Sequence, residues 1–309
     1  MQMNDHNYAA IDCGTNSTRL LIGNKFEILD REMKITRLGE DLDKSGKLSN
    51  QAMSRVLDVL KDFRRSLDTH KVSEVRMVAT SAARDASNSE EFFNQVESTI
   101  GVRPELLTGE EEGRLAFEGA IAELEPSKGP FLILDIGGGS TEFVFGNDKP
   151  ENVHSSQIGC VRLTEEFFDN DPPLPEELHT CLSVIGGHVD DALREIPDIR
   201  NGITLVGLAG TVSCIAAIEI GLEKYDREKI HHFKLLKDAV EDVFRTLATE
   251  NRLERISNPG LEEDRADVIV AGTAILVKVM RQLELTECLV SESDILDGIL
   301  YSMLHDYNK

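Results

Sequence analysis

The sequence has no tryptophan, and aromatic residues make up only 5% of its 309 residues. It also has no apolar run of the roughly 18 residues that a membrane-spanning helix requires. The first residues are polar and lack the charged and apolar regions of a signal peptide. We therefore expect a cytoplasmic protein with no membrane partner.

Cysteine is also scarce, and several common catalytic motifs are missing. The five cysteines are widely scattered without a Cys-x-x-Cys pair, which predicts reduced, mostly buried thiols and argues against a disulfide framework or a zinc site. The sequence contains no Gly-x-x-x-x-Gly-Lys-Ser/Thr, no His-Glu-x-x-His and no Gly-x-Ser-x-Gly. P-loop, zincin and hydrolase-elbow sites therefore have no support.

Basic residues are fewer than acidic ones, 33 against 56, so the formal net charge is −23. Such a surface repels nucleic acid and anionic membranes, so we expect no nucleic-acid partner. A polyanionic substrate would need Mg²⁺ and a local basic patch to approach. One group of basic residues in the second half is interleaved with acidic ones, and plain surface solvation explains it equally well: Lys224, Arg227, Lys229, Lys234 and Lys237.

The most informative stretch covers residues 131–146. An apolar run ends at Asp135, a glycine-rich turn follows, and a second run resumes after Glu142, which predicts strand, tight turn and strand. Glycines let the backbone approach a bulky anion, and successive amide N–H groups can form a nest for phosphate oxygens. Asp135 could hold Mg²⁺ beside a phosphate. The predicted phosphate-binding residues of this turn are Gly137, Gly138, Gly139, Ser140 and Thr141.

The same pattern occurs earlier in the chain, at an offset of 123 residues. Residues 11–23 align without gaps to residues 134–146, with five identical pairs: Asp12/Asp135, Gly14/Gly137, Ser17/Ser140, Thr18/Thr141 and Gly23/Gly146. Two unrelated hairpin turns are the alternative. The paired aspartates and Ser-Thr positions favour a duplicated domain with a phosphate group held between the copies.

The rest of the chain reads as alternating strands and helices. In the first half we expect a helix capped by Ser49 and a loop at residues 80–85 that carries Arg84 at the carboxyl end of a strand, where open α/β sheets bind ligands. The other expected elements of this half are strands at residues 8–12, 18–24, 26–31, 74–79 and 103–107, and helices at residues 89–100 and about 110–124.

The second half repeats this plan. A strand runs into a third small-residue turn at residues 207–211, and residues 126–130 form the candidate hinge. We expect domain I at residues 1–126, with the C-terminal helix at about 295–309 as a candidate addition, and domain II at residues 127–309. The expected elements are strands at residues 131–136, 141–146, 152–158, 202–206 and 284–290, a helix after Pro175, and helices at residues 234–248, 262–283 and from 294.

Three consecutive glutamates, residues 110–112, open a helix directly after a strand. Carboxylates are favoured in a first helical turn by the helix dipole, so simple stabilisation is one interpretation. The other is that one of them orients a water molecule for attack. Arg114 could be the helix-surface ion partner of Glu110.

Glu142 lies on the same face of its strand as Ser140, and burial of its charge without a partner would be costly. This favours a role as a metal or water ligand over simple exposure. His231 and His232 have no partner at metal-ligand spacing, so we expect a solvated surface pair. Residues 291–294 read as a loop and helix cap.

Five motifs in order resemble the exopolyphosphatase/guanosine pentaphosphate phosphatase (Ppx/GppA) family over essentially the whole chain. They are Asp12-x-Gly-x-Asn-Ser17, Thr108-Gly-x-Glu-Glu-Gly-Arg114, Asp135-Ile-Gly-Gly-Gly-Ser-Thr-Glu142, Gly159-x-Val-Arg-Leu-Thr164 and Gly207-x-x-Gly-Thr211. The resemblance implies an α/β fold of two actin-like (ribonuclease H-like) domains with an interdomain active-site cleft. It also implies Mg²⁺ or another divalent cation, and a homodimer.

The resemblance carries roles over by position. Glu112 matches the catalytic glutamate, and Glu142 acts with it; the matched metal ligands are Asp135, Glu142 and Asp12. The matched phosphate-binding residues are Asn16, Ser17, Arg84, Gly137, Gly138, Gly139, Ser140, Thr141, Gly210 and Thr211.

The resemblance implies an exopolyphosphatase that releases terminal phosphate from inorganic polyphosphate. The alternative within the family is hydrolysis of guanosine pentaphosphate (pppGpp) to ppGpp. A small-molecule kinase of the same superfold and an actin-like assembly protein are the other two alternatives. Neither explains the Glu-Glu-Gly-Arg helix start as directly.

Overall fold

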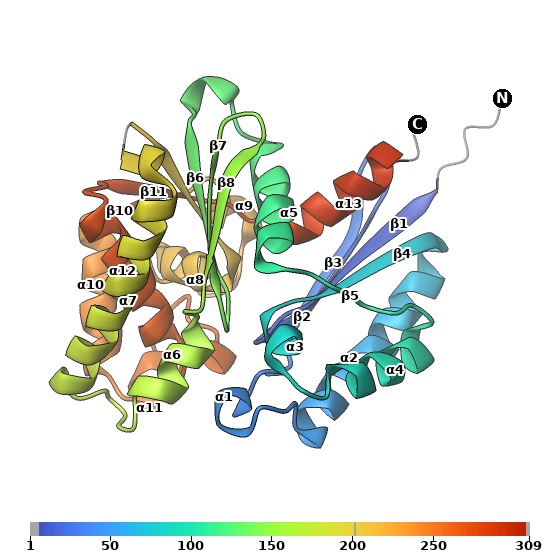
Figure 1. Ribbon diagram of the computed structural model, residues 1–309, viewed down its shortest axis with the longest axis horizontal. Helices are drawn as coiled ribbons and strands as arrows, with labels where there is room; N and C mark the ends of the chain where they lie inside the picture. Colours follow the sequence, from blue (N-terminus) through green and yellow to red (C-terminus); the bar gives the residue numbers. More distant parts are fainter. Residues whose placement is uncertain (1–5, 201, 307–309) are drawn as a thin grey trace. The chain divides into compact units, whose positions relative to one another are not determined.

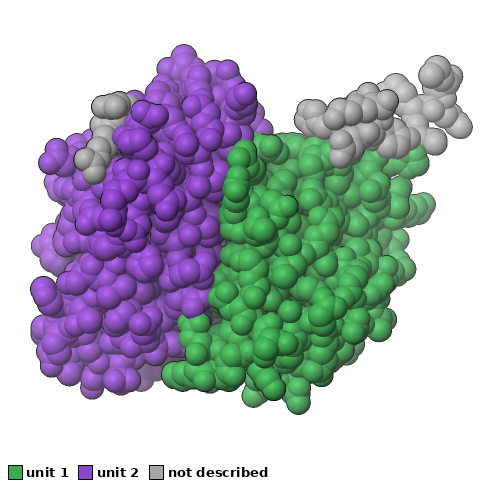
Figure 2. Space-filling model, in the orientation of Figure 1, with its two compact units in different colours: residues 1–119, 295–309 green, residues 120–294 purple. Residues whose placement is uncertain are grey.

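The computed structural model describes residues 6–200 and 202–306 (Figure 1). The chain forms two compact units, unit 1 with Met1–Gly119 and Ile295–Lys309, and unit 2 with Ala120–Asp294 (Figure 2). The first crossing between the units lies inside a helix, α5 (Gly109–Ile121), and the second directly precedes α13 (Ile295–Asp306).

Unit 1 is built on a five-stranded mixed sheet. Its strand order is β3-β2-β1-β4-β5, in which β1, β2 and β3 pair antiparallel while β4 pairs parallel with both β1 and β5. The elements before α5 are β1 (Asn7–Cys13), β2 (Ser17–Gly23), β3 (Ile28–Ile35), α1 (Leu42–Ser45), α2 (Asn50–Thr69), β4 (Val72–Ala79), α3 (Ser81–Asp85), α4 (Ser89–Ile100) and β5 (Glu105–Leu106).

Two helical layers cover this sheet, one on each face (Figure 1). Helices α2 and α4 pack on each other and on one face, where the apolar side of α2 joins Ile11, Leu20 and Ile22 in a buried core. Helix α13 packs on the other face against β1 and β2. The predicted Ser49 cap is confirmed, because its side chain accepts a hydrogen bond from the backbone N–H of Ala52.

Unit 2 contains a six-stranded sheet with the order β10-β11-β9-β6-β7-β8. Helix α12 is buried along most of its length and packs against α6, α7, α8 and α10. The elements are η1 (Pro126–Lys128), β6 (Phe131–Ile136), β7 (Thr141–Gly146), β8 (Pro150–Ser156), α6 (Cys160–Phe167), α7 (Pro175–Glu195), η2 (Pro197–Arg200), β9 (Thr204–Leu208), α8 (Ala209–Ile220), α9 (Arg227–Ile230), β10 (Lys234–Leu236), α10 (Lys237–Thr249), α11 (Arg252–Ile256), η3 (Glu263–Arg265), α12 (Ile269–Gln282) and β11 (Glu287–Val290).

The two units repeat one topology around their glycine turns. In each, an antiparallel three-stranded meander (β1–β3 and β6–β8) is joined through its first strand to a parallel neighbour, β4 in unit 1 and β9 in unit 2. In each turn the first glycine N–H donates to a serine carbonyl at 3.0 Å, from Gly14 to Ser17 and from Gly137 to Ser140. The predicted α/β fold class and the duplicated topology are confirmed.

Several predicted elements differ from the observed ones. The expected loop at residues 80–85 contains the short helix α3, because the N–H groups of Ala83 and Arg84 both bond to the Thr80 carbonyl. The expected helix at 234–248 begins only at Lys237, since residues 234–236 pair with β11. Helix α12 begins at Ile269 rather than at 262, and α6 was not predicted.

The predicted buried thiols are confirmed, because all five cysteines are free and buried. Burial raises the pKa of Cys13, Cys181, Cys214 and Cys288 to about 12, so these thiols stay protonated and unreactive. Within the described residues, no helix is both long enough and apolar enough to cross a membrane.

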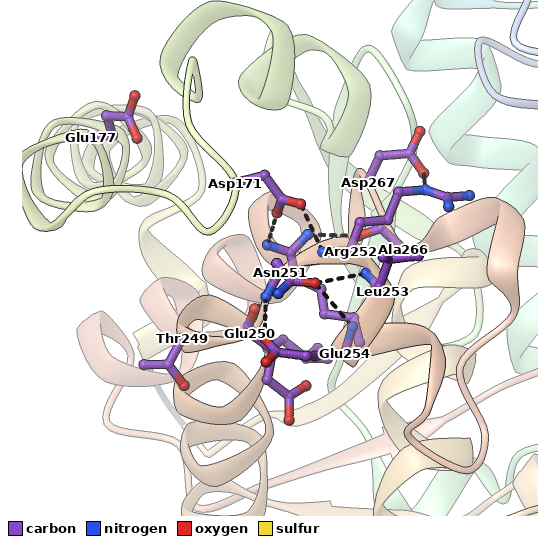
Figure 3. Close-up of polar contacts among 12 residues, drawn as sticks. Asp171, Glu177, Thr249, Glu250, Asn251, Arg252, Leu253, Glu254, Ala266 and Asp267 are labelled. Carbon is purple, nitrogen blue, oxygen red and sulfur yellow. Dashed lines mark hydrogen bonds and ion pairs between the residues drawn. The ribbon is translucent and has the colours of Figure 1, made fainter.

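A buried arginine, Arg255, joins three segments of unit 2, two of which are marked by Asp171 and Ala266 in Figure 3. Arg255 is 2% exposed and donates to the carbonyls of Leu247 (2.8 Å) and Ala266 (2.9 Å) and to the Asp171 carboxylate (2.6 Å). The other Asp171 oxygen accepts the N–H of Arg252 in the first turn of α11. One guanidinium therefore satisfies acceptors that lie far apart in the sequence.

Replacing Arg255 with methionine should lower the free energy of unfolding of unit 2 by about 2–4 kcal/mol, because it leaves two buried carbonyls without donors. Urea denaturation followed by circular dichroism measures this. Arg245→Met is the matched control, since Arg245 is 71% exposed and its ion pair with Asp242 lies on a helix surface, where we expect little change. Equal stability of the two variants would contradict the role given to Arg255.

Candidate active site

The glycine turn of unit 2 is held from one side by the start of α6. The carbonyls of Gly137 and Gly138 accept the N–H groups of Cys160 (3.0 Å) and Val161 (2.9 Å), and the Gly139 carbonyl accepts Nε of Arg162 (2.8 Å). In a trans peptide the N–H points opposite to the carbonyl, so the N–H groups of the next three residues point away from α6. Three successive amides directed to one side form an anion-binding nest.

Gly159 makes this packing possible. A Cβ built on Gly159 would lie 2.4 Å from the carbonyl carbon and oxygen of Gly138, so any larger residue would push α6 away from the turn. Beside it, the Thr141 hydroxyl donates to the Ile158 carbonyl at 2.7 Å. Thr141 is therefore engaged in holding the turn against the segment before α6.

Two buried carboxylates face each other across the strands that leave this turn. Asp135 on β6 is directly opposite Glu142 on β7, and they are only 6% and 1% exposed. The Cβ atoms of such cross-strand pairs are about 4.5–5.5 Å apart. Carboxylate oxygens are ligands that suit a hard divalent ion such as Mg²⁺. The residues present therefore fit the metal that the sequence predicts.

The corresponding pair in unit 1 is different. Asp12 is opposite Arg19 in the register of β1 and β2, and the two side chains form an ion pair of 2.6 Å. The arginine occupies the position that Glu142 holds in unit 2. Asp12 therefore interacts with a cationic side chain of its own unit.

Glu112 and Arg84 meet at the carboxyl edge of the sheet in unit 1. Arg84 Nη1 donates to Glu112 Oε2 at 2.7 Å and to the Leu107 carbonyl at 2.9 Å. The Glu112 side chain is 13% exposed. Burial raises the pKa of Glu112 above its ordinary value; Arg84 opposes this shift, and the negative charge of Asp12 adds to it.

Four polar groups near the ends of β1 and β4 have buried side-chain atoms with no hydrogen-bond partner in residues 6–200 and 202–306: Thr15 Oγ1, both amide atoms of Asn16, Ser81 Oγ and Arg84 Nη2. The two strand ends adjoin, since Cys13 pairs with Ala79 and a Cβ on Gly39 would contact both Thr15 and Ala82. Buried polar groups are normally paired. A ligand rich in acceptor oxygens, such as a phosphate, fits the donors of this set, which are the Thr15 and Ser81 hydroxyls, Asn16 Nδ2 and Arg84 Nη2.

Asn16 and Arg84 of this set were predicted from the sequence, whereas Thr15 and Ser81 were not. The available signal was their position, because each lies within a few residues of a strand end that faces the predicted ligand edge. Ser17 starts β2 and contributes its carbonyl to the turn.

The third small-residue turn joins β9 to α8 in unit 2, as predicted. Ala209 has a φ of +65°, and a Cβ on Gly210 would lie 2.1 Å from Nη2 of Arg265. Thr211 is buried, and Gly272 of α12 packs against its side chain. Arg265, which the sequence analysis missed, therefore places a buried positive charge next to Gly210; its Nε donates to Glu262 at 2.7 Å.

The prediction of a solvated histidine pair is wrong for His231. Its side chain is 15% exposed, its ring stacks on His232 with centroids 3.8 Å apart, and Nε2 lies 2.7 Å from the Glu123 carboxylate. The Nδ1 atom accepts the backbone N–H of Glu292 at 3.0 Å. Glu123, His231 and His232 therefore form one cluster, with one potential ligand atom from each residue within 4.8 Å of the others, close enough to hold a metal ion.

The family model described as "Ppx/GppA phosphatase family" matches residues 15–307. A protein named Exopolyphosphatase 2 from Mycobacterium tuberculosis is 38% identical over 96% of this chain and 98% of its own length.

Solved structures give the same result. The crystal structure of an exopolyphosphatase-like protein has a TM-score of 0.94 and 32% identity over 97% of this chain and 99% of its own. The Ppx/GppA family member from Aquifex aeolicus has a TM-score of 0.79 and 33% identity, covering 98% and 99% of the two chains. The protein described here therefore belongs to the Ppx/GppA phosphatase family.

Proposed function

We propose that this protein is an exopolyphosphatase that hydrolyses the terminal phosphate of inorganic polyphosphate in a reaction that depends on Mg²⁺. The observation that carries the proposal is the group of buried donors without acceptors beside Glu112. Such a set suits an anion with several oxygens and a nearby carboxylate that can orient water. The name of the Mycobacterium tuberculosis relative supports polyphosphate as the substrate.

In the proposed mechanism Asn16, Ser17 and Arg84 of unit 1 bind the terminal phosphoryl group. The amides of Gly138, Gly139 and Ser140 of unit 2 also bind phosphate oxygens. Asp135 and Glu142 would hold the divalent cation, with Asp12 as the third candidate ligand. When bound, Mg²⁺ neutralises charge that develops on the phosphate oxygens.

Glu112 accepts a hydrogen bond from the attacking water and orients it in line with the scissile bond. Arg84 holds the Glu112 carboxylate through Nη1, while its Nη2 is directed to the substrate. Catalysis is mainly positioning and charge stabilisation, as in other phosphoryl transfers. Gly210, Thr211 and Arg265 would bind a further phosphate of the chain.

Phosphate release from long-chain polyphosphate, short-chain polyphosphate and pppGpp, compared side by side with Mg²⁺, tests the proposal. Fastest release from polyphosphate supports it, and fastest release from pppGpp assigns the alternative activity of the family. Turnover of ATP only in the presence of an acceptor, or nucleotide-dependent sedimentation, would replace it with a kinase or an assembly protein. Light scattering during chromatography tests the homodimer, and cell fractionation tests the cytoplasmic location.

The unpartnered hydroxyl of Ser81 provides a sharper test of the phosphate site. Ser81→Ala should raise KM for polyphosphate by about 10- to 100-fold, since a hydrogen bond to a charged group contributes roughly 1.5–3 kcal/mol. It should not lower the free energy of unfolding, because the free protein loses no hydrogen bond. Ser98→Ala on the exposed face of α4 is the control. An unchanged KM would remove Ser81 from the site.

A further inference from the structure

Three polar residues form a row across the strand before the glycine turn of unit 2 and the two strands after it. In the register, Asp135 on β6 is opposite Glu142 on β7, and Glu142 is opposite Ser155 on β8. Residues directly opposite each other share one face of a sheet. The row therefore continues from the two carboxylates to a hydroxyl.

The hydroxyl at the end of the row bonds directly to the nearer carboxylate. Ser155 Oγ donates to Glu142 Oε1 at 2.8 Å, and Glu142 is 1% exposed. A donor fixed on a β-strand limits the rotation of the terminal carboxyl group and so fixes the direction of its oxygens. Removing a group that hydrogen-bonds to a metal-ligating side chain typically weakens metal affinity by about 10- to 100-fold.

Unit 1 shows that this row is not a general requirement of the fold. The corresponding positions, in the register of β1, β2 and β3, are Asp12, Arg19 and Met33. In unit 1 the middle residue, Arg19, has a cationic side chain, and the last residue, Met33, has an apolar one. The hydroxyl is therefore present only in the unit where the middle residue is an acid.

We propose that Ser155 is a positioning residue for the reaction, holding Glu142 in the orientation that binds the divalent cation. The proposal rests on the proposed function for the role of Glu142. Ser155 is given no contact with substrate, so Ser155 acts only through the Glu142 carboxylate.

Binding of Mn²⁺ as a probe, followed by electron paramagnetic resonance on the full chain without substrate, tests the proposal. Ser155→Ala should weaken Mn²⁺ binding and raise the Mg²⁺ concentration for half-maximal activity by about 10-fold. Ser155→Thr keeps a hydroxyl and should restore both values to near those of the parent. Ser183→Ala, on the exposed side of α7, should leave both unchanged.

The outcomes separate this inference from the proposed function. If the parent protein hydrolyses polyphosphate with Mg²⁺ but Ser155→Ala binds Mn²⁺ as the parent does, the positioning role is wrong and the function stands. If Ser155→Thr behaves like Ser155→Ala, the site requires the size of serine and the hydroxyl role is wrong. If Ser155→Ala weakens Mn²⁺ binding but no polyphosphate hydrolysis occurs, Ser155 positions a metal ligand in an enzyme of another substrate.

Discussion

Replacing Glu112 with glutamine should lower kcat for phosphate release by about 10²- to 10⁴-fold, the range that a positioned general base typically contributes. The amide keeps the size of the side chain and still accepts a hydrogen bond from Arg84, but it cannot take a proton from water. KM should change little, because the unpartnered donors that bind phosphate remain. Steady-state kinetics with polyphosphate and Mg²⁺ measures both constants.

Glu110→Gln is the matched control for this variant. Glu110 lies in the same helical turn but is 64% exposed and forms a surface ion pair with Arg114. We expect near-parental kinetics. Equal kcat values for the Glu110 and Glu112 variants would remove Glu112 from the catalytic role.

Stability measurements separate loss of chemistry from loss of structure in Glu112→Gln. Burial raises the pKa of Glu112 in the folded protein, so the folded state binds its proton more tightly than the unfolded state does. The pKa of Glu112 is therefore higher in the folded state than in the unfolded state. As pH rises from the lower of these two values to the higher, ionisation of Glu112 lowers the free energy of unfolding. At neutral pH the glutamine variant should therefore be at least as stable as the parent, and a clear loss of stability would contradict this.

The same shift predicts the acid limb of the pH profile. Because the proposed mechanism uses ionised Glu112, activity should fall on acidification at a pH above the ordinary glutamate pKa of about 4.3. The profile of kcat/KM for polyphosphate measures this. An acid limb at or below the ordinary value would show that another group controls it.

Replacing Asp135 with asparagine should strongly weaken binding of the divalent cation. The loss should exceed the roughly 10- to 100-fold that follows removal of a group hydrogen-bonded to a metal ligand. The variant removes one of two opposed buried charges, so kcat at low Mg²⁺ should collapse and recover in part at high Mg²⁺. Titration of activity and calorimetric Mg²⁺ binding measure the effect. Asp148→Asn, in the exposed turn between β7 and β8, is the control.

Asp12→Asn distinguishes the two halves of the duplication. Asp12 already forms an ion pair with Arg19, so its loss should change the Mg²⁺ requirement less than the loss of Asp135. Equal effects of Asp12→Asn and Asp135→Asn would mean that both turns hold the cation. An unchanged Mg²⁺ titration for Asp135→Asn would exclude it as a ligand.

Local pattern was enough to predict most of the fold. The repeated Asp-x-Gly-x-x-Ser-Thr turn, the strand pairs around it, the Ser49-capped helix and the small-residue turn before α8 all depend on residues close together in the chain. Apolar spacing, glycine and helix caps act over a few residues, so they can be recognised without knowing the fold. The five motifs and their order were sufficient to identify the family.

Tertiary structure alone decided which side chains meet. Arg19 and Glu142 occupy equivalent positions, but only strand register shows that one neutralises an aspartate and the other adds a second charge. The hydroxyls of Thr15 and Ser81 are buried by residues far from them in the sequence. Long-range neighbours also place Arg265 beside Gly210 and His231 beside Glu123. Burial and hydrogen bonding are properties of such long-range neighbours, and no short-range pattern records them.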